Sequence, residues 1–141
     1  MRQERALVLD NLTMAIAYAQ SEALKQKTNM LVCGSSNNRT CNPSKESSWD
    51  RFIVQRAYDH ALLKTFPKLQ YGTLKASISG GKGLIVIENN GRTNKTNGMF
   101  YYCPRNLTHN NNEAGSLIVN DAGRTYLNKN KNAKDEPLFC M

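Results

Sequence analysis

The first part of the chain carries apolar residues at the spacing of an amphipathic helix. They recur at intervals of three and four, at Leu9, Leu12, Ile16, Ala19 and Ala23. Polar residues fall elsewhere on the helical wheel, among them Asn11, Glu22 and Lys25. The pattern predicts a helix that ends near residues 27–29 and packs closely, through its alanines, on the structure that it covers.

Beyond this helix the pattern changes to short strands. Stretches rich in β-branched, aromatic or aliphatic residues are separated by Gly, Asn, Pro and Ser; they read "MLVC", "RFIVQ", "TLKASI", "GLIVIE", "GMFYYC" and "GSLIVND". "NDAGRTYL" predicts a hairpin with Gly123 in its turn, which adds a seventh strand. "AYDHALLKTFPKL" is ambiguous, and one interpretation is a short helix ended by Pro67.

These elements predict an α+β fold, in which one N-terminal helix packs on antiparallel sheets of about seven strands. The length of 141 residues fits a single domain, with the helix in residues 1–29 and a β-rich head in residues 30–141. Trp49 is the only tryptophan, and we expect it to be a core anchor between helix and sheet; an exposed docking residue is the alternative.

The cysteines indicate disulfides. Four cysteines are present without the CxxC spacing of zinc or redox sites, which favours two structural disulfides and an oxidising compartment; free buried thiols are the alternative. Four cysteines allow three connectivities, and the simplest is Cys33–Cys41 with Cys103–Cys140. No apolar run is long enough to span a membrane, and the charged first residues do not form a secretory leader.

The formal net charge of +8 favours acidic partners such as nucleic acid or anionic surfaces. Basic residues gather near the C-terminus, with Tyr126 among them; they are Arg124, Lys129, Lys131 and Lys134. Arg92, Lys95 and Arg105 would extend the patch if their loops converge on it. Such a segment could follow a phosphate backbone, whereas a solvated tail is the simpler interpretation.

No catalytic constellation can be assembled from the sequence. His60 and His109 are the only histidines, and neither lies in a metal-binding or triad motif. We therefore expect no enzyme activity, no metal and no cofactor. Four Asn-x-Thr sequons, at Asn11, Asn38, Asn94 and Asn106, leave a glycosylated eukaryotic ectodomain as an alternative, although an Asn-rich chain forms sequons by chance.

Several motifs together resemble a known family. "QSEALKQ" precedes a short strand that ends in Cys33, and "SSWDRFIV", "GMFYYC" and "LIVNDAGRTYL" follow in that order. From about Ala15 to Tyr126, this arrangement resembles the GspH/FimT family of type IV minor pilins and type II secretion pseudopilins.

The resemblance implies a subunit made as a prepilin with a methylated N-terminus. Its first apolar residues, about twenty of them, would form the membrane-embedded half of the helix, so the present chain would hold only the soluble half. Before assembly, such a subunit lies in the bacterial inner membrane, facing the periplasm; afterwards it is part of the extracellular pilus. Its partners would be other minor pilins and the major pilin.

Within the family, two cysteine pairs and a tail ending at Cys140 look most like the FimU type, which is non-catalytic, primes pilus assembly and sits at the tip. The FimT type binds DNA for natural transformation through a GRxR motif. In this chain Gly123 and Arg124 match that motif, but Tyr126 replaces its second arginine. A DNA-binding minor pilin is therefore the alternative, and a secretion pseudopilin is the lesser one.

Overall fold

A computed structural model shows one helix and nine strands in the residues that it describes. These residues are 2–35, 41, 48–78, 84–93, 98–104, 115–119 and 125–129. The helix α1 spans Arg2–Gln26, and the strands form two antiparallel sheets. The predicted α+β class is confirmed, and the seven predicted strands all occur.

The first sheet has four strands in the order β4-β3-β1-β6. Their bounds are β1 Met30–Gly34, β3 Phe52–Arg56, β4 Leu62–Thr65 and β6 Leu84–Ile87. The central strands β1 and β3 are almost entirely buried, as their continuous apolar runs require, whereas β4 at the edge is mostly exposed.

The second sheet has five strands in the order β2-β5-β7-β8-β9. Their bounds are β2 Ser48–Trp49, β5 Gly72–Ile78, β7 Gly98–Pro104, β8 Gly115–Val119 and β9 Thr125–Lys129. The pairing of β8 with β9 is that of the predicted hairpin. Its turn, including Gly123, lies outside the described residues.

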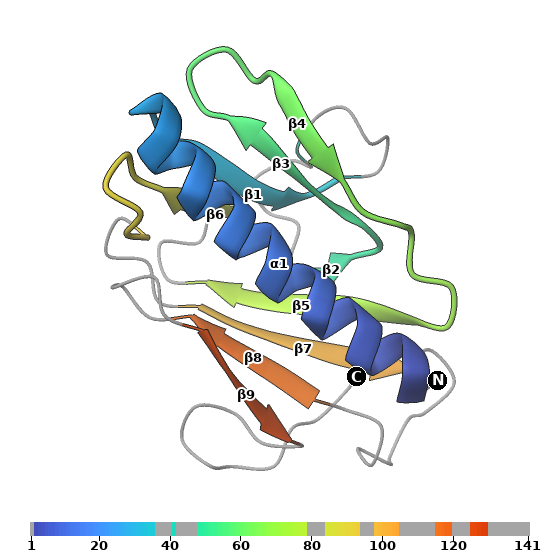
Figure 1. The fold of residues 1–141 in the computed structure, drawn as a ribbon. Helices are drawn as coiled ribbons and strands as arrows, with labels where there is room; N and C mark the ends of the chain where they lie inside the picture. Colours follow the sequence, from blue (N-terminus) through green and yellow to red (C-terminus); the bar gives the residue numbers. More distant parts are fainter. Residues whose placement is uncertain are drawn as a thin grey trace.

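The helix lies across both sheets (Figure 1). It contacts β1, β3 and β6 of the first sheet and β7 and β8 of the second. Its buried residues belong to the same apolar cluster as residues of both sheets, so the helix and the sheets share one core. All five helix positions expected to be buried from the sequence are buried: Leu9, Leu12, Ile16, Ala19 and Ala23.

Trp49 is fully buried in this core. Its ring centroid lies 5.1 Å from that of Phe100 in β7 and 6.4 Å from that of Phe52 in β3. Trp49 therefore bridges the two sheets. Gly34, at the end of β1, lies directly against the indole, because a Cβ atom placed there would be 2.4 Å from Trp49 Cδ1.

The end of α1 has the geometry of a Schellman cap. Lys27 has a φ of 56°, and the Thr28 N–H donates to the Ala23 carbonyl oxygen at 3.2 Å. This bond satisfies a carbonyl of the last helical turn and redirects the chain into β1.

The possible helix before Pro67 is wrong. Leu62–Thr65 forms the edge strand β4, which pairs with β3 through a bulge at Val54/Gln55. In the turn between the two strands, His60 has a φ of 58°. Positive φ angles are usually adopted by glycine, so a histidine at this position does not predict the turn. The two-residue strand β2 was also not predicted, since it is too short to show an alternating pattern.

One predicted disulfide is confirmed. Cys33 in β1 is bonded to Cys41, with 5.6 Å between their Cα atoms. Cys103 is disulfide-bonded as well, and its predicted partner Cys140 lies outside the described residues. Free thiols are therefore excluded for the three described cysteines.

Candidate interaction surfaces

A second apolar face of α1 points away from the sheets. Leu7, Met14 and Leu24 are each more than half exposed, at 57%, 54% and 56%. The exposed residues Ala6 and Ala17 continue this face. Hydrophobic residues of this size are costly to leave in water, so a face that carries several of them along one helix is a candidate interface.

The exposed residues follow a heptad pattern. Positions 7, 14 and 21 are seven residues apart, and so are positions 10, 17 and 24. We call the set Leu7, Asp10, Met14, Ala17, Ser21 and Leu24 the outer stripe. Apolar residues at this spacing form the seam along which one helix packs on another. The buried helix positions predicted from the sequence lie on the opposite side, against this chain's own sheets, and are not available to a neighbouring subunit.

The first turns of α1 are fastened to the second sheet by one carboxylate. Glu4 Oε2 accepts a hydrogen bond from the Gln70 N–H at 2.9 Å, and Oε1 accepts one from the Tyr71 N–H at 2.9 Å. Oε1 also accepts from the Tyr102 hydroxyl at 2.8 Å. Partial burial alone would raise the pKa of Glu4. The hydrogen bonds have a larger combined effect in the opposite direction, so the pKa lies below its usual value of 4.5.

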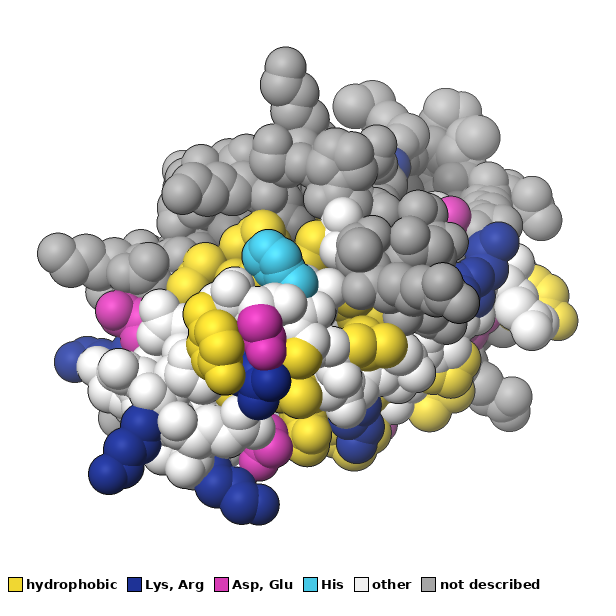
Figure 2. All heavy atoms as spheres, turned by 90° about the horizontal axis from the view of Figure 1, so that it is seen from above, with side chains coloured by type: hydrophobic (Ala, Val, Ile, Leu, Met, Phe, Trp, Pro, Cys, Tyr) yellow, Lys and Arg dark blue, Asp and Glu magenta, His cyan; other side chains and the backbone are white. Residues whose placement is uncertain are grey.

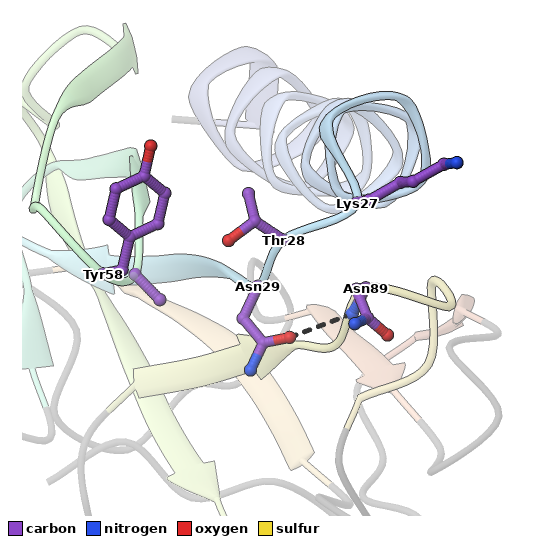
Figure 3. Close-up of a pocket in the computed structure, with 6 residues that line it drawn as sticks. Lys27, Thr28, Asn29, Tyr58 and Asn89 are labelled. Atoms are coloured by element: carbon purple, nitrogen blue, oxygen red, sulfur yellow. Dashed lines mark hydrogen bonds between the residues drawn. The ribbon is translucent and has the colours of Figure 1, made fainter.

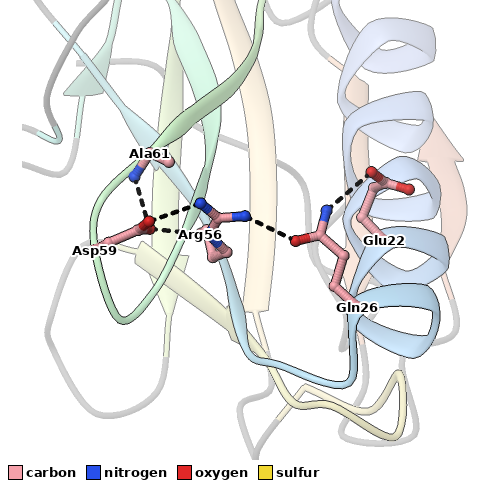
Figure 4. A network of polar contacts seen from close by, with 5 residues as sticks. All are labelled: Glu22, Gln26, Arg56, Asp59 and Ala61. Carbon is pink, nitrogen blue, oxygen red and sulfur yellow. Dashed lines mark hydrogen bonds and ion pairs between the residues drawn. The ribbon is translucent and has the colours of Figure 1, made fainter.

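The other end of α1 is joined to the β3–β4 turn by a chain of polar contacts (Figure 4). Arg56 donates from Nε and Nη2 to the two carboxylate oxygens of Asp59, at 3.0 and 2.6 Å, and from Nη1 to Gln26 at 3.0 Å. Gln26 in turn donates to Glu22 at 3.2 Å. The hydrogen bonds from Arg56 lower the pKa of Asp59 from 3.8 to about 2.

A shallow pocket of about 410 Å³ opens beside this network (Figure 3). It is lined by Lys27, Thr28, Asn29, Ala57, Tyr58 and Asn89. The Asn89 N–H donates to Asn29 Oδ1 at 3.0 Å, which fixes the β6 turn to the start of β1. Seen from this end, the surface mixes hydrophobic, basic and acidic side chains without one dominant charge (Figure 2). The lining supplies polar contacts but no nucleophile with an adjacent base.

The described residues contain neither a metal site nor a membrane-spanning helix. No group of three or more His, Cys, Asp or Glu side chains there is placed to hold a metal ion. Among the helices of that part, none is long and apolar enough to cross a membrane.

Comparison with known proteins decides the family. The profile of the family described as type II transport protein GspH matches residues 9–123, which is most of the chain. The chain belongs to the GspH family. The family expected from the sequence motifs is thereby confirmed. No curated protein sequence matches the chain.

Solved structures show that this GspH-family chain has a fold found in pilins. The type IV minor pilin FimU of Pseudomonas aeruginosa is 19% identical, with a TM-score of 0.68, over 99% of this chain and 97% of that one. The minor pseudopilin EpsH of Vibrio cholerae is 11% identical, with a TM-score of 0.58, over 89% of this chain and 96% of that one. At these identities the likeness is one of fold.

The candidate DNA-binding residues of this GspH-family chain are only partly described. Arg92 is exposed after β6, where its N–H donates to the Asn90 side chain at 3.0 Å. Tyr126 and Lys129 lie in β9. The remaining candidates fall outside the described residues: Lys95, Arg105, Arg124, Lys131 and Lys134. Convergence of these cations on one face stays a prediction.

Proposed function

We propose that this chain is a non-catalytic minor pilin, a structural subunit of a type IV pilus. Its family and its FimU-like fold support a filament subunit, and one observation carries the proposal. The outer stripe of α1 presents Leu7, Met14 and Leu24 to solvent along a helix whose other face is fully used by its own core. A subunit that works alone gains nothing from such a face, whereas a subunit that packs among other helices requires it.

The size of the expected gain supports this role. Burying a leucine or methionine side chain fully contributes on the order of 1.5–3 kcal/mol, and each side chain of the outer stripe is already partly covered. Three such side chains would contribute a few kcal/mol to one contact. That amount suits an interface that forms only in an ordered assembly where several contacts act together.

The family of the chain supports a proposal for where the subunit lies in the cell. We propose that an apolar N-terminal segment continuous with α1 holds it in the bacterial inner membrane, with the head in the periplasm, until it enters the extracellular pilus. In that pilus it joins other minor pilins in the complex that primes assembly, near the tip, and contacts the major pilin. A type II secretion pseudopilin, as EpsH is in Vibrio cholerae, is the lesser alternative.

The test is to locate the protein in its source bacterium. Surface filaments are sheared off and purified, and the protein is quantified by immunoblotting in filaments and cell envelope. The proposal predicts a small amount in the filaments and fewer filaments when the gene is deleted. Normal piliation without the gene, together with absence of the protein from filaments, would contradict it. Loss of secretion with normal piliation would favour the pseudopilin alternative.

DNA capture is a second candidate function. The net charge of +8 and the exposed cation Arg92 favour it, as does the position of Lys129 and Tyr126 on β9, the last strand in the order of its sheet. Titration of the isotope-labelled protein with a short DNA duplex at two salt concentrations tests it. Binding predicts NMR shifts near residues 124–134 that fade as salt rises. Shifts spread evenly over all lysines would exclude a defined DNA site.

A further inference from the structure

The outer stripe of α1 contains one charged residue. Asp10 is exposed and lies between Leu7 and Met14, one helical turn from each. Figure 1 shows that this helix runs across the front of the molecule, with both sheets behind it. Any helix that packs along the stripe over Leu7 and Met14 must therefore also cover Asp10.

Nothing among the described side chains of α1 neutralises Asp10. The nearby Thr13 hydroxyl donates to the Leu9 carbonyl oxygen at 2.9 Å. Lys25 is 15 positions along the helix, about 22 Å away at the rise of an α-helix, and it contacts Glu22 at 4.0 Å. Among the described side chains of the helix, none therefore pairs with this exposed carboxylate.

Covering this carboxylate without a partner would oppose assembly. Removing an ionised group from water costs several kcal/mol unless an opposite charge and hydrogen bonds replace the water. That cost is comparable with the whole gain from the apolar side chains beside it. A neighbour that supplies a cation at this position would offset that cost.

We propose that the outer stripe docks an α-helix of a neighbouring filament subunit, and that this helix presents a Lys or Arg side chain to Asp10. The inference rests on the proposed function and adds the chemistry of the partner. A single polar position in an apolar helix seam also fixes the register and rejects partners that lack the matching group. Asp10 therefore selects the neighbour, while Leu7 and Met14 supply the contact area.

Site-directed photo-crosslinking in the source bacterium identifies the neighbour. The full-length protein carries benzoylphenylalanine in place of Met14, and crosslinked peptides from sheared filaments are identified by mass spectrometry. We expect a peptide from the N-terminal helix of another filament subunit, with a Lys or Arg within one helical turn of the crosslink. A peptide from a globular head, or from a helix without a basic residue there, would overturn the proposal.

Substitutions at Asp10 then test the charge itself. Asp10→Lys is expected to lower the amount incorporated into filaments by about tenfold or more, because like charges would face each other. Asp10→Leu is expected to lower incorporation as well, because it leaves the neighbour's cation buried without a partner. Replacing that cation with Asp should restore incorporation of the Asp10→Lys variant.

The control is Lys68→Glu, a charge reversal at an exposed residue outside the stripe; it should incorporate normally. Wild-type incorporation of Asp10→Lys or Asp10→Leu would overturn the inference. If Met14→Glu nevertheless abolishes incorporation, packing along the stripe stands and only the basic partner is wrong. If Met14→Glu also incorporates normally, the proposed function of the stripe fails too.

Discussion

The Tyr102 hydroxyl donates a 2.8 Å hydrogen bond to Glu4 Oε1, joining the first turns of α1 to β7 across 98 positions of sequence. Tyr102 is fully buried, and a Cβ atom at Gly72 would lie 2.4 Å from its ring, so its position is tightly fixed. This contact holds the N-terminal part of the helix on the second sheet. It adds to the apolar core that the helix shares with both sheets, so the exposed stripe of α1 has a fixed orientation relative to the head.

Removing this contact should destabilise the fold. Tyr102→Phe deletes one hydrogen bond and should lower the free energy of unfolding by about 1 kcal/mol, while Glu4→Gln should cost about 1–2 kcal/mol because a charged acceptor is lost. Urea denaturation measures both. In the double variant the losses should be less than additive, because the two groups share one interaction. Full additivity would show that they act independently.

The same carboxylate should make stability depend on acid. The pKa of Glu4 is lower in the folded than in the unfolded chain, so its contribution is present above pH 4.5 and is lost as the pH falls through the folded value. Between about pH 5 and pH 3, the free energy of unfolding should therefore fall more for the wild-type protein than for Glu4→Gln. Equal losses in the two proteins would show that Glu4 has an ordinary pKa.

The ion pair at the β3–β4 turn predicts a directly measurable value. NMR titration of the side-chain carboxyl should give Asp59 a pKa of about 2, compared with 3.8 for an unperturbed group. In Arg56→Gln the pKa should rise toward 3.8, because the charged donor is gone. An unchanged pKa in that variant would assign the shift to the two backbone hydrogen bonds, one from the Ala61 N–H to Oδ1 at 3.1 Å and one from the N–H of Asp59 itself.

Gly34 should tolerate no side chain while Trp49 is present. Gly34→Ala places a Cβ atom 2.4 Å from Trp49 Cδ1, and the buried indole can move only by disturbing the core. We expect a loss of about 1–3 kcal/mol in thermal or chemical unfolding. In a Trp49→Phe background, the smaller ring leaves room, so the same substitution should cost less. An equal cost in both backgrounds would contradict steric contact as the cause.

The Cys33–Cys41 disulfide closes a short loop onto the central strand β1. For a loop of this length, the chain-entropy argument gives a contribution of about 2–3 kcal/mol. The double variant Cys33→Ala, Cys41→Ala should be less stable by that amount, and a reducing agent should have a smaller effect on it than on the wild type. Unchanged stability would contradict the chain-entropy argument for this bond.

The elements that the sequence predicted are those with a strong local pattern. The helix and the seven strands follow from periodic apolar residues, whereas β4 does not, because its adjacent leucines are only partly buried and its turn places His60 at a positive φ. The Glu4–Tyr102 contact joins distant segments and leaves no local signal. The outer stripe also leaves a local signal, because Leu7, Met14 and Leu24 fall on the two heptad positions of α1, but the buried face is more apolar and gives the stronger pattern.

The measurement that tests the central claim most directly is the incorporation of Leu7→Glu and Met14→Glu into sheared filaments. Both side chains are exposed, so the isolated domains should melt within a few degrees of the wild type, as surface substitutions usually do. If α1 packs on a neighbour through this face, both variants should be folded yet nearly absent from filaments, while Lys68→Glu is present at the wild-type level. Filaments that contain all three variants at wild-type levels would contradict the account.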